Sequence, residues 1–111
     1  MSRIVVKFGG TSVADPNRIE NAADKVQAEV RRGNKVIVVV SAMAGVTNQL
    51  ITNALEAKSI NDSQSKAEYD ALLANGENIT AALMSLALQN LGLEARSLQA
   101  WQVPIKTNSN F

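Results

Sequence analysis

The chain has 111 residues, enough for the core of one small domain but not for two, and 46% of them are apolar. Eleven basic residues stand against ten acidic ones, and no basic run extends beyond Arg31-Arg32, so nothing indicates a nucleic-acid or membrane partner. The sequence contains neither cysteine nor histidine, which excludes disulfides, thiolate catalysis, a histidine general base and most zinc sites.

The first forty residues predict a strand, a helix and a second strand. Residues 4–8 are apolar except for Lys7, as in a short strand. Asp15-Pro16 is typical of a helix start, and Arg31-Arg32-Gly33 is typical of its end. Residues 35–41, KVIVVVS, form a β-branched run without alternation, which predicts a strand covered on both faces. Together they predict a right-handed βαβ unit.

The rest of the chain is predicted to be mainly helical. Apolar spacing indicates helices over 46–55 and 66–74, with a break at Asn75-Gly76. The helix over 77–91 is apolar around most of its surface, so we expect it to be buried or to pack against another subunit. Residues 93–98 indicate a third strand. The fold class is therefore α/β, a three-layer α/β/α sandwich with a mainly parallel sheet.

No export signal is evident in the sequence. The N-terminal apolar run is too short for a signal peptide, and no segment approaches the length and hydrophobicity of a membrane span. We therefore expect a cytoplasmic protein.

The stretch KFGGTS follows the first strand and offers an anion site. Glycines let the backbone N–H groups approach an anion closely, and Lys7 supplies a point charge beside Gly9 and Gly10. The simpler interpretation is a flexible turn with Lys7 reaching to water, and the spacing alone favours it. Neither a Walker A loop nor a G-x-G-x-x-G fingerprint is present.

Two further stretches carry candidate residues. Ser41 ends the second strand at the sheet edge expected for Lys7, and Thr47 or Asn48 could simply cap the helix that follows. Glu77 has an ordinary explanation as a favourable partner of a helix dipole. As it is predicted to open the most buried helix, however, its carboxylate needs a cationic partner.

Taken together and in this order, these stretches resemble the aspartate kinases, members of the amino acid kinase family. The similarity covers essentially the whole chain. Other amino acid kinases tend to carry a Lys-x-Gly-Gly-Ser loop, so KFGGTS followed by SAMAGVT points to the aspartate branch. The matching stretches are VVKFGGTSVAD (5–15), VIVVVSAMAGVTNQL (36–50), NGENITAALMSLAL (75–88) and IKTNSNF (105–111).

The resemblance implies the amino acid kinase (carbamate kinase-like) fold and transfer of the ATP γ-phosphate, with Mg²⁺, to the side-chain carboxylate of L-aspartate. The product is 4-phospho-L-aspartate, the first intermediate towards lysine, threonine and methionine. The resemblance assigns no residue as a metal ligand. It implies the following roles: Lys7 as the catalytic residue that holds the phosphates and stabilises the transferring group, Phe8, Gly9, Gly10 and Ser41 as the rest of the nucleotide site, and Thr47 and Glu77 as aspartate-binding residues.

The similarity also implies that residues 1–111 form the N-terminal part of a catalytic domain. The half that holds the nucleotide base and the regulatory ACT domains would be absent, and we expect the fragment alone to be inactive. A homo-oligomer, or pairing with the missing half, is expected. Two alternatives remain open: another amino acid kinase with a different acceptor, or a non-catalytic half-domain that binds anions or a partner subunit.

Overall fold

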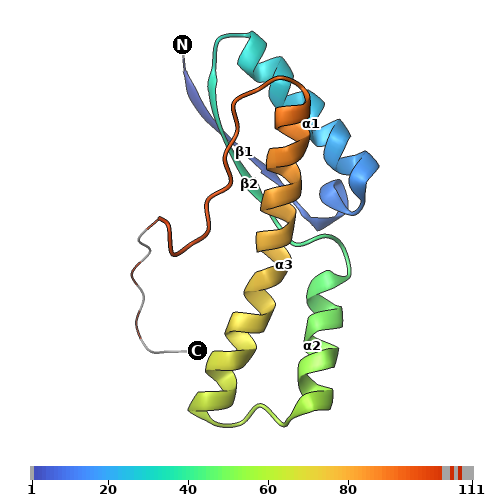
Figure 1. Cartoon of the computed structure of the whole chain (residues 1–111), viewed down its shortest axis with the longest axis vertical. Helices are drawn as coiled ribbons and strands as arrows, with labels where there is room; N and C mark the ends of the chain where they lie inside the picture. The colour runs from blue at the N-terminus through green and yellow to red at the C-terminus, as the bar shows by residue number, and fades with distance from the viewer. Residues whose placement is uncertain (1, 104–105, 107, 109–111) are drawn as a thin grey trace.

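The computed structural model describes residues 2–103, 106 and 108 (Figure 1). The stretch 105–111 that contributes to the family resemblance lies, apart from residues 106 and 108, outside this range. The elements in chain order are β1 (Arg3–Phe8), η1 (Gly10–Val13), α1 (Pro16–Arg31), β2 (Lys35–Val40), α2 (Val46–Ala57) and α3 (Ser63–Asn90).

The predicted βαβ unit is confirmed. β1 and β2 are parallel neighbours, paired from Arg3 with Lys35 to Phe8 with Val40. The carboxylate of Asp15 accepts a hydrogen bond of 2.9 Å from the backbone amide of Arg18, which caps α1. At the other end, Gly33 has a φ of +90°, a left-handed conformation that terminates the helix.

One face of the sheet is covered by helices, and the other is open. Alternate side chains of the strands, including Val6 and Phe8 of β1 and Val38 of β2, pack with buried residues of α1 and α3. On the opposite face Val5 is 67% exposed, Ile37 59% and Val39 43%. The mixed α/β fold with a parallel sheet is as predicted, but burial of the second strand on both faces is wrong for the described residues. Because side chains alternate across a strand, the helices on one side leave the other side bare.

The break predicted at Asn75-Gly76 is wrong, because α3 runs without interruption from Ser63 to Asn90. The side-chain amide of Asn75 donates to the carbonyls of Ala71 and Leu72, at 3.0 and 3.3 Å, and so stays within the helix. Gly76 is buried in a helix–loop contact. Its missing side chain allows close packing there, instead of a turn.

The third strand predicted at residues 93–98 is also wrong for the described structure. This segment is extended but makes no strand pairing with β2 among the described residues. A cavity of about 630 Å³ borders both the segment and β2. The segment is tied instead to the end of α3, where the side chain of Gln89 donates to the carbonyl of Ala95 at 2.9 Å.

The molecule is elongated, because the α2–α3 hairpin projects well beyond the sheet (Figure 1). Its principal extents are 49 × 30 × 17 Å and its radius of gyration is 16.1 Å. A compact domain of this length has a radius of gyration of roughly 13 Å. The 17 Å dimension reflects a sheet that carries helices on one side only among the described residues.

By length and composition alone, α3 could cross a membrane, because an 18-residue stretch of it has a mean hydropathy of 1.2. The expectation that no segment approaches a span is therefore wrong by this measure. Every 18-residue stretch within α3 contains Glu77, and a charged side chain inside a bilayer is costly. Thr80, Met84 and Leu88 are buried against the rest of the chain, and 22% of the apolar stretch is buried in total.

Candidate functional site

The carboxyl ends of the two strands bring the first two motifs together. The backbone amide of Ser41 donates to the carbonyl of Phe8 at 3.2 Å, and that of Ala44 donates to the carbonyl of Gly10 at 3.2 Å. A Cβ atom on Gly10 would lie 2.9 Å from the carbonyl oxygen of Ala42. The loops therefore approach so closely that a side chain at residue 10 would force one of them to move, and the backbone of Ser41 and the glycine loop share one end of the sheet.

Lys7 and Gly9 are accessible from solvent. Lys7 is the penultimate residue of β1 and is exposed on the open face of the sheet. Its ammonium group makes no ion pair or hydrogen bond with any residue between 2 and 103. Gly9 is exposed, and a Cβ placed on it would meet nothing within 4 Å. An anion can therefore reach both the lysine charge and the loop backbone.

Phe8 has two separate environments. Its ring is only 8% exposed and belongs to the core with Val13 and Ile19. Its backbone carbonyl accepts the hydrogen bond from Ser41 described above. Only the backbone of Phe8 lies at the loop, so its side chain acts by anchoring β1 to the helices.

Thr47 lies in the first turn of α2 and is half-buried. The helix is capped by Gly45, at a φ of +84°, and no side chain provides a capping hydrogen bond. The interpretation of Thr47 or Asn48 as the helix cap is therefore wrong, because both residues already lie inside the helix.

Glu77 lies in the middle of α3 and is exposed. The arguments that it sits in a first helical turn and that burial leaves it needing a partner are both wrong. Its neighbour Gly76 contacts the loop after β2 and the start of α2: a Cβ on Gly76 would lie 2.9 Å from the Ala42 Cβ and 3.5 Å from Val46 Cγ1. This contact brings the third motif next to the other two.

The contact between Gly76 and Ala42 is the part of the arrangement that the sequence analysis missed. Ala42 is 6% exposed, and it lies between Gly10 on its backbone side and Gly76 on its side-chain side. A signal was available, since an isolated glycine within an apolar helical pattern often marks close packing. The Asn-Gly pair predicts a break at this position, and the structure shows close packing.

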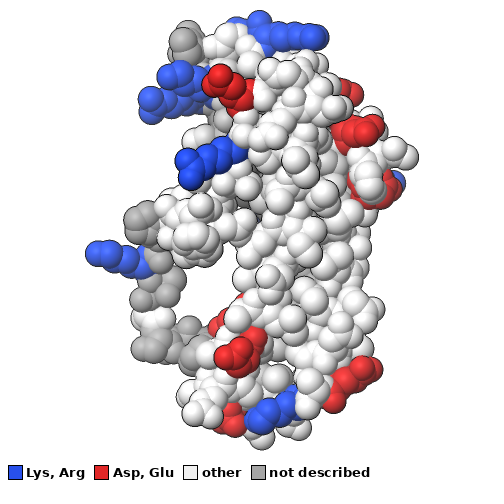
Figure 2. All heavy atoms as spheres, in the orientation of Figure 1, with Lys and Arg blue, Asp and Glu red and all other residues white. Residues whose placement is uncertain are grey.

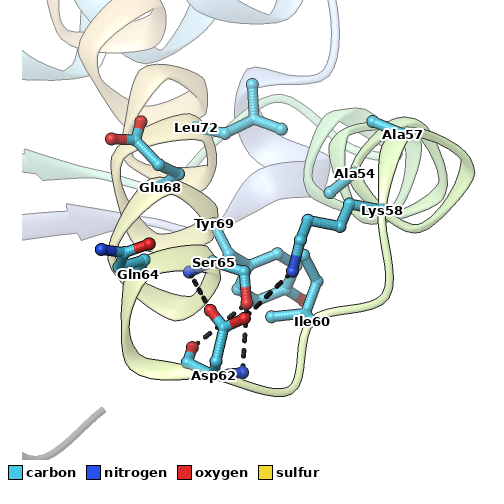
Figure 3. Close-up of a pocket in the computed structure, with 10 residues that line it drawn as sticks. All are labelled: Ala54, Ala57, Lys58, Ile60, Asp62, Gln64, Ser65, Glu68, Tyr69 and Leu72. Carbon is cyan, nitrogen blue, oxygen red and sulfur yellow. Dashed lines mark hydrogen bonds and ion pairs between the residues drawn. The ribbon is translucent and has the colours of Figure 1, made fainter.

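A cavity of about 370 Å³ lies elsewhere, between α2 and the first turns of α3 (Figure 3). Its rim includes the ion pair of Lys58 with Asp62, at 3.1 Å. The backbone amide and the hydroxyl of Ser65, followed by Lys58, lower the pKa of Asp62 to about 2. None of the candidate residues borders this cavity. Asp62 is explained as the N-cap of α3, and of the candidate residues Lys7, Gly9 and Glu77 are exposed.

Charged side chains gather towards the two ends of the molecule, and the middle of the face shown carries few of them (Figure 2). Among residues 2–103, 106 and 108, no group of three or more acidic residues is arranged to hold a metal ion. The chemistry available at the candidate site is therefore one exposed ammonium group, a glycine loop, two hydroxyls and one carboxylate.

Residues 2–110 match the family model described as "Amino acid kinase family". The chain is 53% identical over 111 residues to the aspartokinase of Rickettsia prowazekii (strain Madrid E), covering 100% of this chain and 25% of that protein. It is 48% identical over 109 residues to aspartokinase 2 of Bacillus subtilis (strain 168), covering 98% of this chain and 26% of that protein.

A solved structure agrees with these sequence relatives. The crystal structure of aspartate kinase from Synechocystis matches with a TM-score of 0.73 and 44% identity, over 78% of this chain and 14% of that chain. The present chain spans about a quarter of the length of the curated relatives described above.

Proposed function

Because the chain belongs to the amino acid kinase family, we propose that it forms the phosphate-binding portion of an aspartate kinase, together with part of the aspartate pocket. The reaction is attack of the aspartate side-chain carboxylate oxygen on the γ-phosphorus of ATP. The bond between that phosphorus and the bridging oxygen breaks, ADP leaves, and 4-phospho-L-aspartate forms.

In this proposal Lys7, Gly9, Gly10 and Ser41 hold the phosphates. Phosphoryl transfer needs mainly positioning and neutralisation of charge. The exposed ammonium of Lys7, as the catalytic residue, neutralises the phosphate charge. The glycine backbone positions the phosphates and leaves room for a ligand at Gly9. The backbone of Ser41 lies beside the loop, because its amide donates to the carbonyl of Phe8, and we propose that its hydroxyl contacts the phosphates.

ATP enters with Mg²⁺ bound to its phosphates, which is how this ion is usually carried in kinases. The groups available in the described residues suit phosphate binding better than metal binding. The described residues offer a cation and backbone amides for phosphate oxygens, but no carboxylate cluster for the metal. This part of the chain would therefore bind the nucleotide phosphates and leave the ion to ATP and to other groups.

Thr47 and Glu77 are proposed to bind aspartate. The Glu77 carboxylate is exposed and can pair with the substrate's ammonium group, while Thr47 offers a hydroxyl from the first turn of α2. The observation that carries the proposal is the convergence of three separate motifs through Ala42, which contacts both Gly10 and Gly76.

The remaining elements of the proposal concern the whole enzyme. Its relatives are about four times as long as this chain, so further segments would supply the base pocket and further aspartate contacts. We propose that the enzyme acts in the cytoplasm, opens the route to lysine, threonine and methionine, and works as a homo-oligomer or through pairing of the two halves of the kinase domain.

A chimera tests this proposal. Residues 1–111 replace the aligned segment of the Rickettsia prowazekii aspartokinase, and ADP release is measured with L-aspartate, L-glutamate, N-acetylglutamate or UMP as acceptor. We expect turnover with L-aspartate only. Turnover with another acceptor would favour a different amino acid kinase, and an inactive but folded chimera would favour a non-catalytic module. The parent aspartokinase is the control.

A further inference from the structure

The structure points to Gly76 and Ala42 as positioning residues, which we propose set the distance between Glu77 and the phosphate loop. This inference rests on the proposed function. Neither residue carries a functional group, so both act through the backbone segments that they hold in contact.

The contact is tight on both sides of Ala42. A Cβ on Gly76 would lie 2.9 Å from the Cβ of Ala42, and a Cβ on Gly10 would lie 2.9 Å from its carbonyl oxygen. Real Cβ atoms essentially never approach so closely, and neither neighbouring atom belongs to a flexible side chain. A side chain added at residue 10 or at residue 76 must therefore move a segment of backbone.

The turn of α3 around Gly76 cannot deform locally to make room, so it moves as a unit. Thr80 is fully buried, and its hydroxyl donates to the carbonyl of Gly76 at 3.1 Å. Two apolar side chains of α2 lie within contact distance of the same point, Val46 Cγ1 at 3.5 Å and Leu50 Cδ1 at 3.8 Å. A displaced Gly76 therefore carries Glu77, its neighbour, away from the loops after β1 and β2.

The two glycines have different expected effects because they contact different atoms of Ala42. Gly76 meets the side chain of Ala42, which Ala42→Gly removes. Gly10 meets the backbone oxygen of Ala42, which no substitution removes. Ala42→Gly should therefore rescue Gly76→Ala but not Gly10→Ala.

The experiment measures steady-state kinetics of the chimera described above. In Gly76→Ala we expect the KM for aspartate to rise roughly 10- to 100-fold, the scale on which small misplacements act, with the KM for ATP changed less than about twofold. The double variant Ala42→Gly/Gly76→Ala should recover the KM for aspartate. Gly10→Ala should raise the KM for ATP, and Ala42→Gly should not restore it. Ser85→Ala, nine residues farther along α3, is the control and should behave like the unmodified chimera.

Each result decides between the alternatives. An unchanged KM for aspartate in Gly76→Ala would overturn the inference, as would a failure of Ala42→Gly to restore it. Equal increases in both KM values would indicate general loss of structure and also contradict the positioning role. The activity of the unmodified chimera tests the proposed function separately, since it does not depend on any change at residue 76.

Thermal unfolding of the 111-residue chain gives a readout without activity. In an unstrained helix, replacing glycine by alanine stabilises, so a helix free of the clash would raise the Tm of Gly76→Ala. We expect a lower Tm instead, and its recovery in the double variant. A higher Tm in Gly76→Ala would show that the contact with Ala42 does not constrain α3.

Discussion

The backbone amide of Ser41 donates a hydrogen bond of 3.2 Å to the carbonyl of Phe8. This bond continues the parallel pairing of β1 and β2 by one residue beyond the pair of Phe8 with Val40. Both loops consequently leave the sheet at the same point, next to Lys7. The proposed phosphate site depends on this relationship, since it brings the backbone of Ser41 next to the end of the strand that carries Lys7.

Replacing Lys7 by alanine should remove most of the kcat of the chimera. A preorganised charge of this kind contributes roughly 10²- to 10³-fold to the rate, or about 3–4 kcal/mol of transition-state stabilisation. The matched control is Lys35→Ala, which removes an exposed lysine from the opposite end of the neighbouring strand. If both variants lost activity equally, the specific role of Lys7 would be wrong.

Replacing Glu77 by glutamine should raise the KM for aspartate, because the uncharged amide cannot pair fully with an ammonium group. Loss of one charge-assisted hydrogen bond costs roughly 1.5–3 kcal/mol, or about 10- to 150-fold in affinity. Thr47→Ala should act in the same direction with a smaller effect. Glu68→Gln, at another exposed position of α3, serves as the control. A change in the KM for ATP alone would contradict the assignment of Glu77.

The 111-residue chain alone should not phosphorylate aspartate at a measurable rate. Holding both reactants in line contributes roughly 7–11 kcal/mol to lowering the barrier, and an open surface forfeits most of it. A coupled ADP-release assay with aspartate and Mg-ATP measures this. Aspartate-dependent turnover of about 1 s⁻¹, within the range of intact enzymes, would show that these residues alone form a complete active site.

The open face of the sheet should make the isolated chain associate with itself. Val5, Ile37 and Val39 form an apolar strip there that is between 43% and 67% exposed. Light scattering against concentration should show association, and Ile37→Lys should weaken it because a charge interrupts the strip. The matched variant Ile79→Lys, on the exposed side of α3, should have a smaller effect. Monomeric behaviour of the unmodified chain at all concentrations would contradict this prediction.

Acid should weaken the start of α3 through Asp62. Hydrogen bonds from Ser65 and then the charge of Lys58 lower its folded-state pKa from 3.8 to about 2. A lowered pKa means that the ionised form stabilises the fold, fully above about pH 4 and progressively less as the pH falls through about 2. Far-ultraviolet circular dichroism of the chain between pH 6 and pH 2 measures this loss.

Two variants separate the charge of Asp62 from its capping role. Asp62→Asn keeps a capping side chain without the charge, so its stability should change less between pH 5 and pH 2 than that of the unmodified chain. Asp62→Ala removes the cap and should be the least stable of the three at pH 7. Parallel acid profiles for the unmodified chain and Asp62→Asn would show that the cap is unaffected by ionisation.

The sequence predicted local features well where a few neighbouring residues decide them. Asp15 before Pro16 predicted the start of α1, and Gly33 predicted its end, because capping and a left-handed turn depend on adjacent backbone groups. The order of the first strand, helix and second strand followed from the same kind of signal. The shared end of the sheet followed from parallel pairing.

Predictions about burial and packing failed at Asn75-Gly76, at Glu77 and at residues 93–98. Glycine favours a turn in an isolated peptide, and only the neighbouring Ala42 shows that at residue 76 it allows close helix packing. The apolar helix predicts a buried Glu77, yet Glu77 lies on the exposed side of α3. The alternating pattern of residues 93–98 fits a strand, but pairing depends on whether β2 lies within hydrogen-bonding distance.

The amino-acid sequence alone shows which residues are available for the chemistry: one lysine beside two glycines, two hydroxyls and a carboxylate, with histidine and cysteine excluded. It also determined the strand, helix and strand that place the first two motifs at one sheet end. The three-dimensional packing was needed to show that the third motif reaches them through the contact of Gly76 with Ala42, and which face of the sheet is open among the described residues. The reason is physical: caps, turns and periodicity act over a few neighbouring residues, whereas the approach of residue 76 to residue 42 depends on the shapes of segments far apart in the chain.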